Sequence, residues 1–381
     1  MGPTCMATQI YLVFTDDWEL RGDGSGDPTQ IQFRPLQELA RIFAERSIRG
    51  SFNAEVMQQL TFRSFQDRYP HLKDWADEWE RVVTEAFRQG HDFQLHIHPQ
   101  WKGAVYDGKR WILPAPWSIL EHPRVDAARM ITEGIKLLQV LLQPIRSGYR
   151  CVSFRAGAWC IAPSGFMLDL LASQDIRFDM SIVRGISYNF PVQLDYRHAE
   201  EGFFPFYPDM CDARRIAAGK KPIVCIPTAC FPEGPLVLLR RDARRIANQF
   251  CTRNNSTPAK LAAADASGSP YRAWVPRITL PVRVLRRLRT YFTGRWLISD
   301  LANLDYDQLV NMMRYIRAMA RRSETEAVPV ILANHTKDIT DFSHIERFLD
   351  DIATAPDIHC ITLTELSGML ESGRFSIRIN K

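Results

Sequence analysis

Short apolar runs alternate with amphipathic helical segments at both ends of the chain, and this alternation restricts the fold more than any other feature. The predicted elements are, in order, strand 9–14, helix 35–45, strand 48–53, helix 75–88, strand 93–96, helix 125–142, strand 151–154, a helix from 162, helix 306–321, strand 328–333, helix 345–352 and strand 358–362. Strands and helices that take turns predict βα units around a mainly parallel sheet or barrel.

The alternation breaks down between about residues 184 and 300, where the sequence becomes rich in proline, aromatic residues and arginine. The last βα units are needed to close the first ones, so we expect this stretch to be an insertion and not a second domain. A chain of 381 residues with 46% hydrophobic residues can form one large core. We therefore expect a single domain over residues 1–381 with an insertion at about 184–300.

Neither the N-terminus nor the cysteines indicate export. The first residues show no basic segment followed by a long apolar stretch, and the eight cysteines form no CxxC pairs. We expect reduced cysteines and a cytoplasmic protein.

Polar residues follow several of the predicted strands at the point where each strand ends. In parallel α/β folds the carboxyl ends of the strands meet on one face, where active sites gather. The residues in question are Asp16, Asp17, Asn53, His96, His98, Arg155 and His335.

The histidines and the carboxylates are suited to bind a metal ion. His96 and His98 are two residues apart on a strand, so their side chains share one face. Two imidazoles and one carboxylate, with a coordination position left for water, are typical of a hydrolytic Zn²⁺ site, where the metal activates water and polarises a carbonyl. Asp16 and Asp17 point to opposite faces of a regular strand, so both can serve only if the chain bends there. Glu19, on the same face as Asp17, is the reserve ligand.

Four segments resemble, in the right order, the first, second, third and fifth motifs of the polysaccharide deacetylase family, the NodB-like enzymes of carbohydrate esterase family 4. They are Thr-Asp-Asp at 15–17, His-Ile-His-Pro at 96–99, Phe-Arg-Ala-Gly-Ala-Trp at 154–159 and Ile-Leu-Ala-Asn-His-Thr-Lys at 331–337. The resemblance covers about residues 8–182 and 296–365. It implies a distorted, incomplete (β/α)7 barrel of the α/β class.

The resemblance also implies a role for each matching residue. The roles are Asp16 as general base, Asp17, His96 and His98 as metal ligands, Arg155 as the residue that holds the base, His335 as general acid and Asp179 as the partner that raises the pKa of His335. The implied cofactor is a divalent metal, Zn²⁺ first, with Co²⁺, Ni²⁺ or Mn²⁺ as alternatives.

Three features depart from the family pattern. The histidines are spaced H-x-H where the family has H-x-x-x-H, Gly157 stands where the family has proline, and the fourth motif is not clearly present. These departures concern the second motif most.

The implied reaction is the removal of an N-acetyl group from an acetamido sugar of a polysaccharide or glycoconjugate precursor. Trp101, Trp111 and Trp117 on the segment after the histidines, and Trp159 in the third motif, are candidates to stack on sugar rings, although packing within loops explains them equally well. Basic residues among them suit an anionic, lipid-linked or nucleotide-linked glycan.

Two alternatives stay open. One is a C–N amidohydrolase that acts on a small non-sugar amide, because one fold hosts several chemistries. The other is a non-catalytic protein that binds glycan or membrane on the same scaffold, and the altered second motif favours it.

Residues 281–292 form a basic amphipathic pattern. Such a helix can pack on the barrel or lie at the inner face of an anionic membrane. Nucleic-acid binding is disfavoured, since no stacking or groove-reading motif accompanies the arginines.

Overall fold

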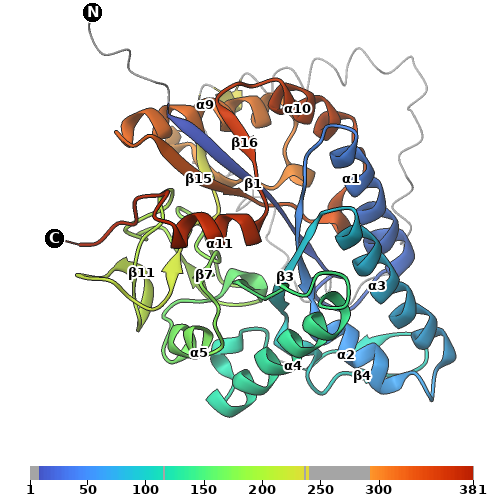
Figure 1. The fold of residues 1–381 in the computed structure, drawn as a ribbon. Helices are drawn as coiled ribbons and strands as arrows, with labels where there is room; N and C mark the ends of the chain where they lie inside the picture. The colour runs from blue at the N-terminus through green and yellow to red at the C-terminus, as the bar shows by residue number, and fades with distance from the viewer. Residues whose placement is uncertain (1–7, 115, 236, 240–291, 381) are drawn as a thin grey trace, which may run out of the picture.

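A parallel sheet of eight strands forms the centre of the computed structural model, which describes residues 8–114, 116–235, 237–239 and 292–380 (Figure 1). The strand order is β12-β7-β6-β3-β2-β1-β15, and β16 pairs with the first half of β1 while β2 pairs with its second half. The strands are β1 Gln9–Trp18, β2 Ser51–Glu55, β3 Asp92–Ile97, β6 Ser153–Ala156, β7 Phe178–Asp179, β12 Val224–Cys225, β15 Ala327–Leu332 and β16 Ile358–Cys360.

Helices connect these strands and cover the outside of the sheet (Figure 1). Their bounds are α1 Arg34–Ala44, α2 Val56–Phe65, α3 Pro70–Arg88, α4 Arg124–Leu142, α5 Met167–Ser173, α9 Tyr306–Arg322, α10 Ser343–Ala353 and α11 Leu363–Glu371. Within α1, Leu36, Leu39 and Phe43 recur at helical spacing and are buried, so one face of the helix packs on the sheet. Among the described residues no helix is long and apolar enough to cross a membrane.

The sheet curls into an incomplete barrel. Beyond β12 the chain crosses toward β15, where Thr228 N donates to Ile182 O at 3.0 Å and Ala229 N donates to Ile331 O at 2.8 Å. Only an isolated bridge between Thr228 and Ile331 spans this gap in the described part of the chain. The predicted incomplete (β/α) barrel is confirmed.

The described part of residues 184–300 is built mainly of two-stranded antiparallel sheets. These pair β8 Ser187–Tyr188 with β9 Leu194–Asp195, β10 Pro208–Asp209 with β11 Asp212–Ile216, and β13 Cys230–Glu233 with β14 Arg295–Ile298. The same stretch also supplies β12, so the predicted insertion contains one strand of the barrel itself. Most of the arginine-rich segment, including the basic pattern predicted at 281–292 up to residue 291, lies outside the described residues.

Alternate residues of β1 face two different cores. Leu12 and Phe14 belong to the large core between the sheet and the helices, whereas Val13 belongs to a smaller one inside the barrel with Ile331 and Leu366. Because the side chains of a strand alternate, the inward face of β1 continues from Val13 to Asp17 and then to Glu19 just beyond the strand. This alternation positions the site.

Candidate functional site

The register of the sheet arranges the polar side chains of the barrel interior in layers. Asp17 pairs in register with Asn53, whereas Glu55 pairs with His96 and His96 with Arg155. Trp18 pairs in register with Ala54, so the next residues of the two segments, Glu19 and Glu55, lie at the same level. Residues at one level of parallel strands point to the same side, so Asp17 lies one layer below the glutamates and His96.

Asp17 and Glu19 line a cavity of about 430 Å³ at the carboxyl ends of the strands, and Asp16 is not among the described residues around it. Asp16 instead accepts from Asn334 Nδ2 at 2.5 Å and from Thr336 N at 3.3 Å. Burial raises the pKa of Asp16 to about 7. The chain does not bend in the way that would bring both aspartates into the site, because the strand stays paired with β2 as far as Trp18.

Asp17 is the carboxylate that Arg155 holds. Its Oδ1 accepts from Arg155 Nη1 at 2.6 Å and from Asn53 Nδ2 at 2.8 Å, and its Oδ2 lies 3.5 Å from His335 Nε2. Burial opposes ionisation of Asp17, but the charge of Arg155, with smaller contributions from His96 and His335, lowers its pKa to about 2. From the sequence we expected Arg155 to hold Asp16. Arg155 holds Asp17 instead, because its side chain on β6 and that of Asp17 on β1 both point into the barrel.

A residue that the sequence did not single out fixes the other arm of Arg155. Arg155 Nη2 donates to Thr228 Oγ1 at 2.9 Å, and Thr228 Oγ1 donates to Met180 O at 2.8 Å. The guanidinium also lies over the ring of Trp159, 4.6 Å from its centroid. Thr228 belongs to the segment that crosses toward β15, so the near-closure of the barrel helps to orient the arginine.

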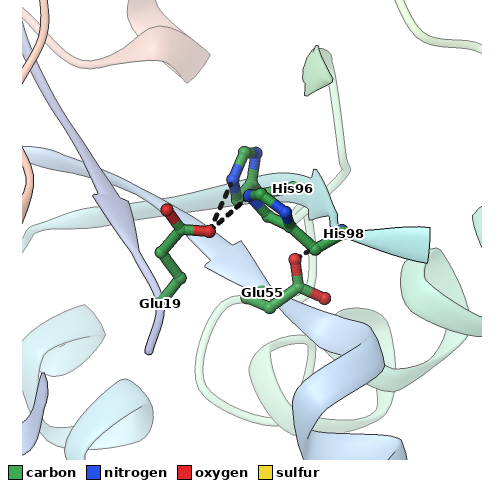
Figure 2. Close-up of side chains that lie close together, drawn as sticks. All are labelled: Glu19, Glu55, His96 and His98. Atoms are coloured by element: carbon green, nitrogen blue, oxygen red, sulfur yellow. Dashed lines mark hydrogen bonds and ion pairs between the residues drawn. The ribbon is translucent and has the colours of Figure 1, made fainter. Parts of the chain in front are cut away.

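The side chains of Glu19, His96 and His98 converge above Asp17, beside Glu55 (Figure 2). Glu19 Oε2 lies 2.5 Å from His98 Nε2 and 3.3 Å from His96 Nε2. One ligand atom from each of the four residues lies within 4.8 Å of the others. The two histidines therefore share a face, as their spacing predicted.

The surroundings of this cluster suit a divalent metal ion. His96 Nδ1 lies 2.8 Å from the carbonyl oxygen of Arg155 and must donate to it, which directs the lone pair of Nε2 toward Glu19. A proton on each Nε2 or a shared metal ion would satisfy the contacts between these imidazoles and the carboxylate of Glu19, and two imidazoles with one carboxylate are a zinc-type donor set.

Glu55 is a weaker candidate, since its oxygens accept from Met57 N at 2.8 Å and from His98 N at 2.6 Å. Burial raises the pKa of Glu55 to about 6. Glu55 thus both caps α2 and holds the backbone of His98.

Asp17, the expected metal ligand, does not belong to this cluster. Its Oδ1 is taken by Arg155 and Asn53, and it lies one layer below His96. Glu19, the reserve ligand, occupies the place expected of Asp17.

His335 lines the same cavity, and Asp300 is its hydrogen-bond partner. His335 Nδ1 lies 2.8 Å from Asp300 Oδ2, and although burial opposes its protonation, the charge of Asp300 raises the pKa of His335 to about 9. Asp179, the partner expected from the sequence, instead accepts from Ser181 Oγ at 2.6 Å on β7, and burial raises its pKa to about 6. Asp300 comes two residues after the end of β14, so it too follows a strand, but it lies at the end of the predicted insertion.

The tryptophans divide into core and cavity residues. Trp101 and Trp111 are 3% and 8% exposed, with ring centroids 5.2 Å apart, and both pack on Phe62 of α2. They lie outside the set of described residues that line the cavity, because the short helix Pro99–Trp101 and the β4–β5 hairpin (Val105–Tyr106 and Trp111–Ile112) place them against Phe62. Trp159 does line the cavity, together with Trp117 and Tyr188.

Comparison with known proteins supports the fold. No protein-family model and no curated protein matches the sequence. The structure is similar to that described as a "putative polysaccharide deacetylase" from Mycobacterium smegmatis, with a TM-score of 0.51 and 11% identity over 98% of this chain and 94% of the other.

Two further structures superpose with TM-scores below 0.5, too low to support an argument. The "probable" polysaccharide deacetylase of Pseudomonas aeruginosa PAO1 gives 0.48 at 10% identity over 97% of this chain and 93% of the other, and Puue allantoinase gives 0.45 at 10% over 96% and 91%. The chain thus has a fold similar to that of the Mycobacterium smegmatis protein, and the likeness at this level of identity concerns the fold alone.

Proposed function

We propose that the protein is a metal-dependent hydrolase that removes N-acetyl groups from an acetamido sugar of a polysaccharide or glycoconjugate precursor. One observation carries the proposal: the Glu19–His96–His98 donor set, Asp17 in contact with Arg155, and His335 in contact with Asp300 all lie at a single cavity, which is lined by the donor set, Asp17 and His335. Hydrolysis of an amide needs an activated water, a proton acceptor and a proton for the leaving nitrogen.

Glu19, His96 and His98 would hold the metal, which we expect to be Zn²⁺, with Co²⁺, Ni²⁺ or Mn²⁺ as alternatives. A divalent ion at this position supplies Lewis acidity toward the acyl oxygen and makes water a better nucleophile at neutral pH. The carbonyl of Arg155 and the carboxylate of Glu55 hold the two histidines in place.

Asp17 is proposed as the general base. Arg155 keeps it ionised, and Oδ2, the oxygen that Arg155 does not contact, lies 3.5 Å from His335. The geometry favours Asp17 over Asp16 for this role.

His335 is proposed as the general acid. Asp300 keeps it protonated at neutral pH, so it can donate from Nε2 to the leaving nitrogen. The proton that Asp17 took from water then returns to His335 across the 3.5 Å that separates them, and both groups regain their starting states.

The aromatic side chains of the cavity support a sugar as substrate. Trp117, Trp159 and Tyr188 line the cavity together with the proposed metal ligands, and aromatic rings stack on the apolar faces of sugars. The expected cytoplasmic location, and contact of the arginine-rich segment with an anionic membrane, stay predictions.

Acetate release tests the proposal. Purified protein is loaded with Zn²⁺, incubated with N-acetylglucosamine oligomers and, separately, with small non-sugar amides, and acetate, ammonia and bound metal are measured. We expect one Zn²⁺ per chain and acetate from the sugar. Protein that binds no metal, or that releases product only from small amides, would contradict the proposal.

A further inference from the structure

Lys337 places an ammonium group beside the metal ligands, where the proposed reaction does not use it. Lys337 lies in the turn Thr336–Asp338 directly after His335, and its side chain is 14% exposed. Its Nζ contacts Glu19 Oε1, while Glu19 Oε2 faces the two imidazoles. Lys337 also lines the cavity.

An ammonium group has three N–H donors, and Glu19 accepts the one hydrogen bond that the structure assigns to Lys337. The remaining donors belong to a side chain that lines the cavity, beside the atoms that would hold a metal. A ligand in the cavity can therefore accept from Lys337 without breaking the contact with Glu19.

Arg21 is a second cation on the same cavity. In the part of the chain that the structure describes, no carboxylate pairs with its guanidinium. The other two cations near the metal ligands are already matched, Arg155 by Asp17 and His335 by Asp300. Arg21 and Lys337 thus have donors to offer to a ligand.

Two carboxylates, Asp23 and Asp338, line the same cavity. Asp23 accepts from Ser25 N at 3.0 Å, and Asp338 is grouped with His335 and Asp300. Asp17 and Glu19 also line the cavity and are paired with Arg155 and Lys337, so an anion would bind at the donors of Lys337 that Glu19 does not take.

We propose that the substrate carries an anionic group, a carboxylate or a phosphate, which binds to Lys337 with support from Arg21. This inference rests on the proposed function for the N-acyl group and adds the chemical class of the sugar: an acidic or phosphorylated N-acetylated amino sugar. Charged hydrogen bonds from lysine and arginine to carboxylate or phosphate are short and strong.

Binding of inorganic phosphate to the Zn²⁺-loaded protein tests the subsite without turnover, by calorimetry. We expect Lys337→Met and Arg21→Met to weaken phosphate binding, Lys337→Met by about tenfold or more, which is what one charged hydrogen bond is worth. Lys337→Arg keeps the charge and should stay within about threefold of the unmodified protein. Lys102→Met is the matched control, because Lys102 pairs with Asp126 at 2.8 Å and is not among the described cavity residues.

Phosphate held by the metal alone would bind Lys337→Met as tightly as the unmodified protein, and that result would overturn the proposal. Turnover of N-acetylglucosamine, its 6-phosphate and its 6-carboxylate then separates the two sources of charge. We expect kcat/KM to favour one of the charged sugars, and Lys337→Met to remove that preference. If only the neutral sugar releases acetate, the proposal of an anion-binding subsite at Lys337 is wrong. If phosphate binds but no sugar releases acetate, the proposed deacetylase function is wrong and the anion-binding subsite stands.

Discussion

Exchanging the two adjacent aspartates one at a time gives the sharpest test of the site. Asp17→Asn keeps the size of the side chain but removes the proton acceptor beside His335. General bases contribute about 10²–10⁴-fold, so kcat should fall by that factor, which corresponds to about 3–5 kcal/mol of barrier. The metal should remain, because Glu19, His96 and His98 are unchanged.

Asp16→Asn should behave differently. Asp16 is buried, its pKa is raised to about 7, and it accepts from Asn334 and Thr336, so a neutral amide whose oxygen accepts in its place should leave kcat within a few-fold. The roles that the family motif implies by position predict the opposite result: Asp17→Asn would lose metal, and Asp16→Asn would keep metal and lose activity.

Folding must be checked in both variants, since Arg155 is fully buried. Removing the charge of Asp17 leaves the guanidinium without its counter-ion, and breaking a buried pair costs about 3–5 kcal/mol. Steady-state acetate release, bound metal and the thermal midpoint are therefore measured on each variant. An Asp17→Asn protein that is folded, metal-loaded and fully active would refute the assignment.

Three further changes test other parts of the site. Glu19→Gln should weaken Zn²⁺ binding by at least about tenfold in a chelator competition, and unchanged affinity would remove Glu19 from the ligand set. Because the pKa of His335 is about 9 and the acid must be protonated, kcat/KM should be retained below that pH and fall above it. Asp300→Asn should shift this fall in kcat/KM to lower pH. A fall that stays at the same pH would show that Asp300 does not set the pKa of the general acid. Trp111→Ala should cost about 3–5 kcal/mol of unfolding free energy with little change in KM, whereas Trp117→Ala should raise KM, and the reverse would reassign the two rings.

The strands and their polar ends were predictable because they depend on local patterns. Apolar runs and helical periodicity mark β1, β3, β6 and β15, and the residues after them lie at one end of the sheet. The face on which each carboxylate of β1 points was harder to predict. The direction of each side chain depends on how far β1 stays paired with β2. That pairing joins residues about 36 positions apart, such as Asp17 and Asn53, so no local pattern reveals it.

The partner of His335 could not be predicted for a related reason. Asp300 and His335 are 35 residues apart and meet because the Asp300–Ala333 bridge sets the two chain segments side by side. The position of Asp179 in the sequence matches that of the expected partner of His335. Asp179 ends β7, however, and both of its carboxylate oxygens accept hydrogen bonds from Ser181. The order of the strands along the chain does not determine which residues at their ends face each other across the barrel.

The histidine spacing and the place of the carboxylate ligand are linked by the geometry of the sheet. His96 and His98 lie in successive layers, and Glu19 is at the level of His96, so one glutamate oxygen reaches both imidazoles. A carboxylate at Asp17 would lie one layer below His96 and two below His98, too far to meet both rings. In the proposed metal site the carboxylate that meets both rings of this H-x-H pair is therefore Glu19, one alternation beyond Asp17. Asp17, the proposed base, lies in the lower layer, where the guanidinium of Arg155 contacts it and lowers its pKa.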